Sequence, residues 1–361
     1  MGYRLKDFVI VGAGLYGAVS ARVLTDKGYD CTVVDKRPHI GGNCYTENKN
    51  GIQVHMYGPH TFHTNSYGVW DFLSEFTRFN NFRNHTKVNY KGSIYSFPIN
   101  MFTLHQLWGV CSPEEAKRKL EEVKHDIPNP TNIEDFCLAN IGEELYETFV
   151  YGFTKKQWGK EPRDLPASII KRIPIRFTYN DNYFDDVYQG IPIGGYTKLF
   201  ENLLDGIDVH LGVDYLKERG KWRAKQFIYT GPIDEFFDYQ LGELEWRSMR
   251  FEHFLLEDTD YQGNPVIHYT DSETPYKRII EHKHFDFDGQ KDTVITKEFP
   301  ESWDRSKEKF YPINDAKNSN LYESYRKMIP DNFIFGGRLA RYKYYDMDQV
   351  VASALSTSLR L

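Results

Sequence analysis

The stretch from Phe8 to Asn43 constrains the fold more than any other part of this 361-residue chain. It begins with a short apolar run, Phe8–Val11, which is typical of a strand buried on both faces of a parallel sheet. Glycines at GxGxxG spacing follow at positions 12–17 and lead into a segment with helical periodicity. A second apolar run, Cys31–Val34, ends in Asp35. This succession predicts a complete βαβ dinucleotide-binding unit at the start of the chain.

Each glycine of the motif has its own physical reason. Gly12 permits a tight turn, Gly14 lets the backbone approach a pyrophosphate, and Gly17 lets the helix pack closely on the strand. The helix N-terminus then offers free N–H groups and a positive dipole end to the phosphates. Asp35 follows at the distance expected of an acceptor for a ribose diol. Because GxGxxG alone also occurs in ordinary turns, the prediction depends on both strands, the helix and Asp35 together.

The composition limits the number of domains and the classes of partner that fit this sequence. A chain of 361 residues exceeds what one hydrophobic core usually holds, so more than one domain is expected. The net charge of −6 and the lack of a basic run argue against a nucleic-acid partner. The four cysteines show neither CxxC nor metal-ligand spacing. The sequence offers no membrane-spanning run and no room for a signal peptide before the first strand, so we expect a cytoplasmic protein.

A second glycine-rich turn, KRPHIGGN, follows Asp35 and contains Gly41, Gly42 and Asn43. A Rossmann protein that binds only NAD does not need this turn. It resembles the Arg-x-x-x-Gly-Gly segment that FAD-binding proteins of the glutathione-reductase or amine-oxidase type carry beside the flavin ring. The resemblance favours FAD over NAD, and the alternative is an ordinary turn between a strand and a loop.

Three histidines follow this turn. His60 and His63 are three residues apart, but no cysteine or carboxylate joins them and His55 at ligand spacing. The intervening Gly58-Pro59 indicates a loop rather than a helix. We therefore expect no metal site here. The segment is either a surface loop or a loop folded over the flavin ring.

The middle of the chain predicts a hairpin, then helices, then a loop. Residues 84–97 alternate about Lys91-Gly92, as in a β-hairpin. From 101 to 152 the pattern becomes helical, with Ser112 as the cap of one helix. Prolines at 162, 166 and 174 preclude a long helix afterwards. The expected loop carries Trp158, Lys171, Arg172 and Arg176.

The last part of the chain returns to strands. Residues 190–204 predict a glycine-rich turn and an amphipathic helix. VHLG (209–212), FIYTG (227–231) and the alternating segments up to Phe299 predict strands, which we assign to a mostly antiparallel second sheet. Near the C-terminus, an apolar strand at Phe333–Phe335 precedes Gly336-Gly337-Arg338, and a helix is expected to begin near Asp346.

These patterns predict an α/β fold in three parts. A discontinuous, Rossmann-like FAD-binding domain is assigned to residues 1–80, 190–240 and 315–361. Residues 100–165 form a helical insert domain. Residues 81–99, 166–189 and 241–314 form a mostly antiparallel β-sheet domain with the substrate site. This division places VHLG and FIYTG in the FAD-binding domain, although their pattern suggested the antiparallel sheet.

Over essentially its full length, the chain resembles the bacterial UDP-galactopyranose mutases. The matching segments include VGAGLYGAV, HIGGN, YGPHTFHT, FPIN, TKKQWGKEP, LPASIIKRIPIRF, YNDNYF, GIPIGGYT, TPYKRIIEHKHF and GGRLARYKYYDMD. Most of these segments are not generic to FAD proteins. The resemblance implies an enzyme that interconverts UDP-galactopyranose and UDP-galactofuranose without net redox change, in the biosynthesis of cell wall polysaccharide. It also implies a homodimer.

The implied chemistry explains why the sequence shows no Ser–His–Asp or paired-carboxylate constellation. In this family, N5 of reduced FAD attacks the anomeric carbon and displaces UDP, so that the sugar ring can open and close again in its five-membered form. The protein must then supply binding, orientation and charge compensation for the departing UDP. A pyrophosphate suits the planar fork of arginine, and a phenol can donate to a phosphate.

The resemblance assigns roles to particular residues. Those implied in catalysis are Arg172 on a mobile loop, Arg247, and His63 beside the flavin. Those implied in binding the substrate are Phe153, Thr154, Trp158, Tyr183, Tyr311 and Tyr344, together with both arginines. The glycines, Asp35 and Asn43 are already expected to bind the cofactor. The resemblance adds His60, Arg338, Asp346 and Met347 to these cofactor residues.

Two residues depart from the family pattern, and alternative functions stay open. Phe153 stands where some members have a tyrosine that stacks on uracil, and His268 stands where an asparagine is expected. One alternative is a mutase for the N-acetylated sugar nucleotide, although His60 favours the plain galactose form. Another is an FAD oxidoreductase of the amine-oxidase or protoporphyrinogen-oxidase type. A third is a catalytically idle binding module.

Overall fold

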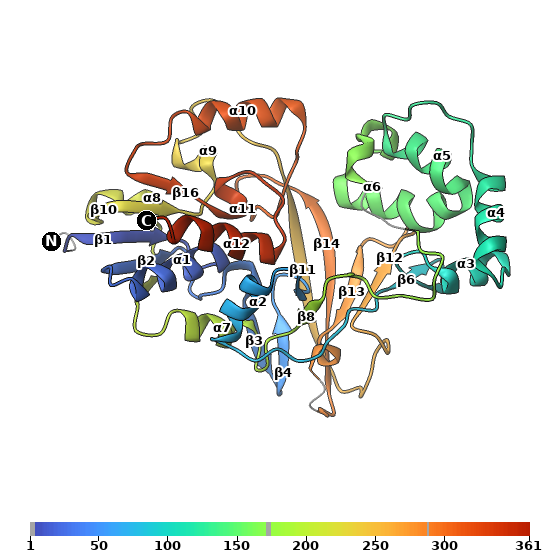
Figure 1. The fold of residues 1–361 in the computed structure, drawn as a ribbon, viewed down its shortest axis with the longest axis horizontal. Helices are drawn as coiled ribbons and strands as arrows, with labels where there is room; N and C mark the ends of the chain where they lie inside the picture. Colours follow the sequence, from blue (N-terminus) through green and yellow to red (C-terminus); the bar gives the residue numbers. More distant parts are fainter. Residues whose placement is uncertain (1–3, 171–174, 287–288) are drawn as a thin grey trace.

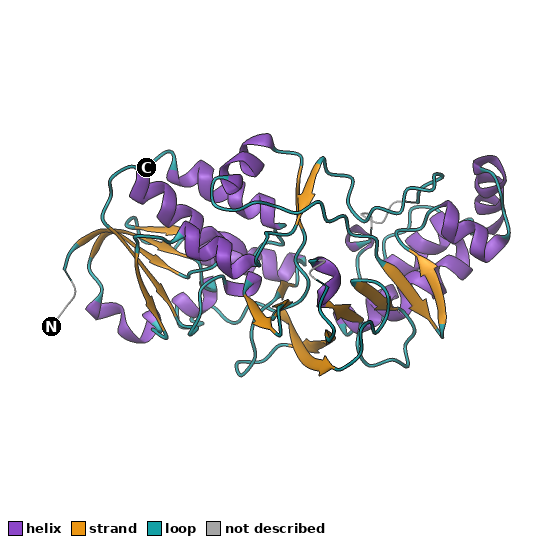
Figure 2. Cartoon of the chain, turned by 90° about the horizontal axis from the view of Figure 1, so that it is seen from below, coloured by secondary structure: helices purple, strands orange, loops and turns teal. Residues whose placement is uncertain are grey.

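The computed structural model describes residues 4–170, 175–286 and 289–361. The molecule is elongated, with a five-stranded sheet at one end, a seven-stranded sheet in the middle and a group of helices at the other end (Figure 1). Both termini lie at the end formed by the five-stranded sheet, and a view turned by 90° shows the same order along the long axis (Figure 2). The predicted α/β fold class is confirmed.

The five-stranded sheet has the order β16-β10-β1-β2-β9, and its neighbouring strands are parallel. Its strands are β1 (Lys6–Val11), β2 (Cys31–Asp35), β9 (Asp208–Leu211), β10 (Ala224–Tyr229) and β16 (Phe333–Phe335). VHLG and FIYTG therefore lie in this sheet, and the prediction that they belong to the antiparallel sheet is wrong. A short apolar run does not identify its partner strand, and here the partners, β2 and β1, are far away in the sequence.

Helices cover both faces of this sheet. The face that carries Ile10 and Val33 is packed against α1 (Leu15–Asp26), α7 (Tyr196–Leu203) and α12 (Met347–Ser358). The face that carries Val9 and Val34 is packed against α8 (Tyr215–Glu218), α9 (Ile233–Phe236) and α10 (Ala316–Arg326). Because both faces of the sheet are buried, the sequences of its strands are continuous apolar runs.

The two ends of the chain meet at the carboxyl edge of this sheet. Gly336 follows β16 directly and precedes α11 (Gly337–Ala340). A Cβ on Gly336 would lie 2.0 Å from the ring of Tyr16 in α1. The Tyr16 hydroxyl in turn donates to Thr357 Oγ1 in α12 at 3.1 Å. This contact fixes the last strand and the last helix against the first helix.

The seven-stranded sheet has the order β15-β11-β14-β13-β12-β6-β7. Its strands are β6 (Lys87–Tyr90), β7 (Ser93–Ser96), β11 (Trp246–Leu256), β12 (Val266–Tyr269), β13 (Arg278–Glu281), β14 (Thr293–Ser302) and β15 (Tyr311–Pro312). β12 and β6 are parallel, and the other neighbours are antiparallel. A mostly antiparallel second sheet and a hairpin about Lys91-Gly92 are both confirmed.

Two small strand pairs connect the sheets to the site described below. They are β3 (Thr46–Lys49) with β4 (Ile52–His55), and β5 (Phe62–Thr64) with β8 (Tyr188–Gly190). Helix α2 (Tyr67–Ser74) follows β5 and begins at the N-cap Ser66. None of the helices in the described ranges combines the length and apolar composition needed to cross a membrane.

The helical end of the molecule is built from the segment after the hairpin. Its helices are α3 (Met101–Trp108), α4 (Pro113–Val123), α5 (Ile133–Tyr146), a π-helical turn (Glu147–Tyr151) and α6 (Gly152–Trp158). Two 3₁₀ turns follow, Pro162–Asp164 and Ala167–Ile169. The prediction that Trp158 lies in the loop is wrong. Helix α6 continues through Trp158 and ends at Gly159, whose φ of +65° turns the chain away.

We expect Gly336→Ala to lower the melting temperature by roughly 2–8 °C, because a methyl group forced against the buried Tyr16 ring overpacks the core. Gly68→Ala is the matched control: Gly68 lies in α2, and a Cβ there meets nothing within 4 Å. Alanine favours a helix over glycine, so this variant should melt at the same or a higher temperature. Thermal unfolding followed by circular dichroism compares them, and equal shifts would contradict the packing argument.

Candidate functional site

The two glycine-rich turns face each other at the carboxyl end of β1 and β2. The Gly41 N–H donates to the Ala13 carbonyl oxygen at 2.9 Å. A Cβ on Gly42 would lie 3.0 Å from the Gly14 Cα, which is tighter than an ordinary contact, so the two backbones approach each other closely. We call these two turns, residues 12–17 and 41–43, the glycine cradle. The cradle leaves backbone N–H groups at the start of α1 open to an anion.

The other two glycines of the first turn have structural reasons. A Cβ on Gly17 would lie 1.9 Å from the Gly12 carbonyl oxygen, so helix α1 could not pack this closely with any other residue there. Gly12 itself has a φ of +111°, and a Cβ on it would meet Thr230 Oγ1 at 1.9 Å. Both positions therefore need glycine for backbone geometry.

Asp35 lies at the end of β2 beside the cradle and is 9% exposed. Its Oδ2 accepts the Ala13 N–H at 2.7 Å, and its Oδ1 accepts the Arg37 N–H at 2.8 Å. These bonds fix the carboxylate, which still has lone pairs free for a diol. The open cradle and the fixed carboxylate fit the pyrophosphate and ribose of a dinucleotide.

The start of the C-terminal helix closes the cradle. The Cys44 thiol, directly after Asn43, donates to the Met347 sulfur at 3.7 Å. Asn43 is held by Arg37, whose Nη1 donates to its Oδ1 at 3.0 Å. Asp346 is the N-cap residue of α12, as the sequence predicted for the start of this helix. The Cys44–Met347 contact thus brings the segment that contains Asn43 against the start of α12, where Asp346 and Met347 lie.

His60 lies close enough to Arg338 and Arg278 for their charges to act on its pKa. Its backbone N–H donates to Nδ1 of His55 at 3.0 Å, and its own Nδ1–H donates to the Gly58 carbonyl oxygen at 2.8 Å. Burial, with the charge of Arg338, lowers the pKa of His60 to about 4, and burial lowers the pKa of His55 to about 3. Both imidazoles are therefore neutral near neutral pH.

Three predicted tyrosines and the predicted Arg338 gather with Arg278, and we call these residues the phenol–arginine group. The rings of Tyr311 and Tyr344 stack with centroids 5.5 Å apart. The Arg338 guanidinium lies 5.0 Å from the Tyr344 ring centroid and 5.8 Å from that of Tyr311. Tyr183 is close enough to Arg278 for the charge to act on the pKa of its phenol. The group combines two cations with three hydroxyls.

The three phenols stay protonated in this group. Burial raises the pKa of Tyr344 to about 12, and it also raises the pKa of Tyr183 and Tyr311. Protonated hydroxyls can donate hydrogen bonds, and the guanidinium groups carry permanent positive charge. The arrangement is chemically suited to an anion such as a diphosphate.

A buried carboxylate holds Arg278 in place. Glu298 is fully buried and contacts Lys277 Nζ at 2.7 Å and Arg278 Nε at 2.5 Å. Burial alone would raise the pKa of Glu298, but these two cations lower it to about 2. Lys277 also donates to Gln157 Oε1 in α6 at 2.8 Å. Sequence reasoning did not single out Arg278, and the Lys-Arg pair at the start of a strand was the signal that it offered.

Arg247 lies in β11 and is 5% exposed. Its Nε donates to the Gln157 carbonyl oxygen at 2.8 Å, and its Nη2 donates to that of Lys156 at 3.3 Å. Its Nη1 donates to Ser302 Oγ at 3.0 Å. Arg247 therefore caps the C-terminal end of α6, where the helix dipole favours a cation. One N–H remains on each Nη, and the predicted pyrophosphate contact stays a prediction.

Helix α6 carries the remaining predicted substrate residues. The Phe153 ring centroid lies 5.2 Å from that of His268, at an interplanar angle of 40°. Thr154 is buried in the same helix, and Trp158 packs against the hydrophobic core of the helical end. Arg172, predicted to close on the pyrophosphate, lies outside the described residues, as does Lys171.

His63 does not join the phenol–arginine group directly. Its Nδ1 lies 2.7 Å from Asp186 Oδ2, and its ring stacks on Phe184 with centroids 3.6 Å apart. Phe184 in turn meets the Tyr183 ring edge-on at 4.9 Å. The structure thus connects His63 to the group through Phe184, and its predicted place beside the flavin stays a prediction.

Potential metal ligands cluster elsewhere. In the described part of the chain, Asp260, Glu281 and His284 bring their ligand atoms within 4.8 Å of one another. Nε2 of His284 lies 3.3 Å from each carboxylate, and these contacts raise its pKa, Glu281 most strongly. The three side chains form an ion-paired cluster that includes none of the predicted residues.

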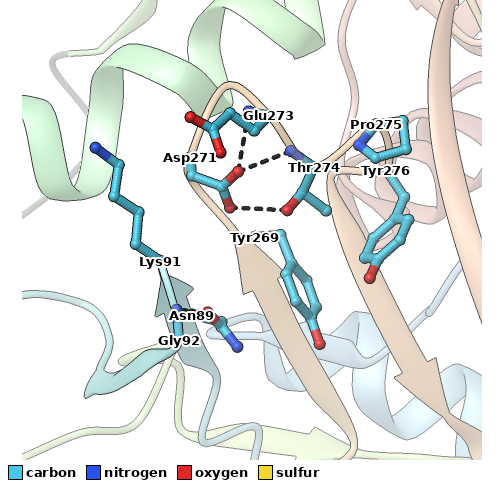
Figure 3. Close-up of a pocket in the computed structure, with 9 residues that line it drawn as sticks. All are labelled: Asn89, Lys91, Gly92, Tyr269, Asp271, Glu273, Thr274, Pro275 and Tyr276. Atoms are coloured by element: carbon cyan, nitrogen blue, oxygen red, sulfur yellow. Dashed lines mark hydrogen bonds between the residues drawn. The ribbon is translucent and has the colours of Figure 1, made fainter.

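A pocket of about 680 Å³ opens beside the turn that joins β12 to β13 (Figure 3). Tyr269 lines it and directly follows His268, so the two side chains point to opposite faces of the sheet. Asp271 at its rim accepts hydrogen bonds from the backbone of Glu273 and from Thr274. None of the predicted cofactor or substrate residues lines this pocket. The cradle and the phenol–arginine group are therefore the stronger candidate.

The fold and the site define a Rossmann-type dinucleotide-binding protein with an anion-binding group on the adjoining sheet. The family model for UDP-galactopyranose mutase matches residues 148–344, and that for NAD(P)-binding Rossmann-like domains matches residues 10–76. The chain belongs to the UDP-galactopyranose mutase family. It is accordingly an enzyme of the sugar-nucleotide isomerase class, and the family implies a flavin cofactor.

Individual relatives agree with this assignment. The chain is 42% identical to dTDP-fucopyranose mutase of Escherichia coli, over 97% of each chain. It is 40% identical to the probable UDP-galactopyranose mutase of Klebsiella pneumoniae, over 98% of this chain and 94% of that one. A crystal structure of reduced UDP-galactopyranose mutase matches with a TM-score of 0.74 at 16% identity, over 99% of this chain and 93% of that chain. That structural match supports the fold.

The buried histidines predict a loss of stability in mild acid. His55 and His60 have folded-state pKa values of about 3 and 4, and burial lowers those of His268 and His282 well below the usual value. As the pH falls, these histidines are protonated in the unfolded chain before they are protonated in the folded protein. The free energy of unfolding therefore has its full value above about pH 6.5 and decreases below it, by about 1.4 kcal/mol per pH unit for each histidine. The pKa of His284 is raised in the folded protein, so protonation of this one histidine stabilises the fold as the pH falls and partly offsets the loss.

Melting temperatures measured from pH 7.5 to pH 5 check this, because Glu298 does not titrate in that window. The control is His55→Asn, in which the amide oxygen can replace Nδ1 as the acceptor for the His60 N–H. Its melting temperature should fall less steeply on acidification than that of the wild type. A constant melting temperature for the wild type over this range would contradict the argument.

Proposed function

We propose that the protein is a flavin-dependent isomerase that interconverts UDP-galactopyranose and UDP-galactofuranose and uses FAD in its reduced form. The observation that carries this proposal is the phenol–arginine group, which a buried carboxylate holds in place. Membership of the UDP-galactopyranose mutase family supports it. The homodimer implied by the resemblance stays a prediction.

On this proposal, the cradle binds the cofactor. The N–H groups in the first turn of α1 would hold the FAD pyrophosphate, and Asp35 would accept hydrogen bonds from the ribose. Asn43, Asp346 and Met347 remain proposed contacts of the flavin. When bound, the reduced flavin supplies the nucleophile for the anomeric carbon of the sugar. The neutral His60 adds no positive charge of its own at this point.

The phenol–arginine group then binds the diphosphate. As the bond between sugar and UDP breaks, negative charge grows on the β-phosphate, and Arg278 and Arg338 with the three phenols can stabilise it. Because Glu298 fixes Arg278 beforehand, little reorganisation is needed when the charge develops. Arg172 and Arg247 remain proposed contacts of the same diphosphate, and Phe153, Thr154 and Trp158 remain proposed contacts of the nucleoside.

A second candidate is the equivalent isomerisation of a dTDP-linked sugar. The relative named dTDP-fucopyranose mutase is 42% identical over nearly the whole chain, which is close to the 40% identity of the probable UDP-galactopyranose mutase. The proposed diphosphate and flavin contacts are the same for both candidates. They differ in the base, in the ribose and in the substituent at the sugar C6.

We expect the dithionite-reduced protein to convert UDP-galactofuranose to UDP-galactopyranose and the oxidised protein to show almost no conversion. The physical reason is that only reduced flavin has a nucleophilic N5. Chromatography of the sugar nucleotides measures the products, and a parallel reaction with dTDP-fucopyranose tests the second candidate. Equal rates in both redox states would refute the proposed chemistry, and flavin reduction by the substrate would favour an oxidoreductase.

We expect Arg278→Met to lower kcat/KM by about 10²-fold or more, because it removes a cation from the developing charge. Arg278→Lys should recover part of the loss. The matched control is Arg250→Met, since Arg250 is exposed and bonds to Glu301 on the neighbouring strand. Steady-state kinetics with the reduced protein give the values, and bound flavin reports whether each variant is folded. Equal losses in the two methionine variants would remove Arg278 from the site.

A further inference from the structure

His268 is a buried polar side chain that the site described so far does not use. It lies in the middle of β12, in register with Val88 of β6 and Arg278 of β13, and is 7% exposed. Its ring is flanked by two aromatic rings, Phe153 at 5.2 Å and Phe97 at 6.3 Å between centroids. His268 thus lies where helix α6 faces the sheet, beside the phenol–arginine group.

Neither ring nitrogen of His268 has a hydrogen-bond partner among the residues that the structure describes. Neither of these nitrogens is fully buried, so each retains some accessible surface. An unpaired polar group in an otherwise buried side chain is costly. Such a group is therefore expected to meet a partner that enters the site.

The electrostatic surroundings keep this imidazole neutral. Burial lowers its pKa well below the usual value, and the charges of Arg278, Lys277 and Lys156 act in the same direction, against Glu298. A neutral imidazole has one N–H donor and one acceptor nitrogen. It can therefore recognise an uncharged polar edge, whereas the neighbouring arginines recognise an anion.

We propose that His268 reads the nucleobase of the sugar nucleotide, donating its N–H to a carbonyl oxygen of a pyrimidine whose face is covered by Phe153. This inference depends on the proposed function, which brings a nucleoside diphosphate to the phenol–arginine group. Arg278 belongs to that group and is the strand neighbour of His268, so a diphosphate on Arg278 places its nucleoside within reach. The ligand class is an oxo-pyrimidine nucleoside diphosphate.

Uracil and thymine share this chemistry. Both carry carbonyl oxygens at the same ring positions, and thymine adds a methyl group that favours apolar surroundings such as Phe153 and Phe97. An asparagine would offer a donor and an acceptor side by side, whereas one edge of an imidazole presents a single nitrogen. The His268 contact therefore admits both bases, and the test separates UDP from dTDP.

Isothermal titration calorimetry of the purified flavoprotein with UDP, dTDP and inorganic pyrophosphate tests the inference. We expect His268→Phe, which keeps a ring but removes the donor, to weaken the tighter of the two nucleotides roughly 5- to 30-fold. His268→Asn should restore most of that affinity. Pyrophosphate has no base, so its affinity should be the same in all variants. A merely structural role would change pyrophosphate binding in parallel.

The matched control is Tyr269→Phe, because Tyr269 follows His268 in β12 and points into the pocket on the opposite face (Figure 3). It should leave the affinity for both nucleotides unchanged. Unchanged nucleotide affinity in His268→Phe, or a parallel loss for pyrophosphate, would overturn the inference. If the base contact holds but the reduced protein converts neither sugar nucleotide, the proposed reaction fails and the base contact stands.

Discussion

The close approach of glycine backbones at the carboxyl edge of the five-stranded sheet is the constraint on which the rest of the structure depends. A Cβ on Gly42 would lie 3.0 Å from the Gly14 Cα, and a Cβ on Gly12 would clash with Thr230. Near the other end of the chain, Gly336 leaves room for the Tyr16 ring. These contacts join segments more than three hundred residues apart into one edge. Because the edge lies at the strand ends, where α1 begins, it opens toward an anion-binding helix terminus.

A second constraint, the burial of Glu298, organises the middle sheet. A carboxylate without exposure is stable only if cations accompany it, and Lys277 and Arg278 do so from the neighbouring strand. Lys277 reaches α6 through Gln157, and Arg247 caps the same helix. These bonds fasten the helical end to the sheet, and they set Phe153 opposite His268. The same charges that stabilise this contact give the site its anion-binding character.

The sequence predicted those features that depend on neighbours along the chain. The cradle glycines, the hairpin at Lys91-Gly92 and the start of α12 follow from local backbone preferences, and the structure confirms them. The tyrosines and Arg338 came from the family resemblance, and they do gather in one place. Strand partners of VHLG and FIYTG were misassigned, because alternation gives no information about which distant strand will pair. The prediction for Trp158 is wrong because α6 continues through this residue and ends only at the C-cap Gly159.

The amino-acid sequence by itself determined the dinucleotide-binding unit, since glycine spacing acts through φ and Cβ sterics that need no partner from elsewhere. It also determined the family, through motifs spread along the whole chain. Only the tertiary structure decided which charges and rings meet. Arg278, Glu298 and Lys277 form one buried group, and Arg247 caps a helix. His268 faces Phe153 and has no polar partner among the residues that the structure describes. The physical reason is that burial and pairing depend on strand register and helix docking, which arise from contacts between residues distant in the sequence.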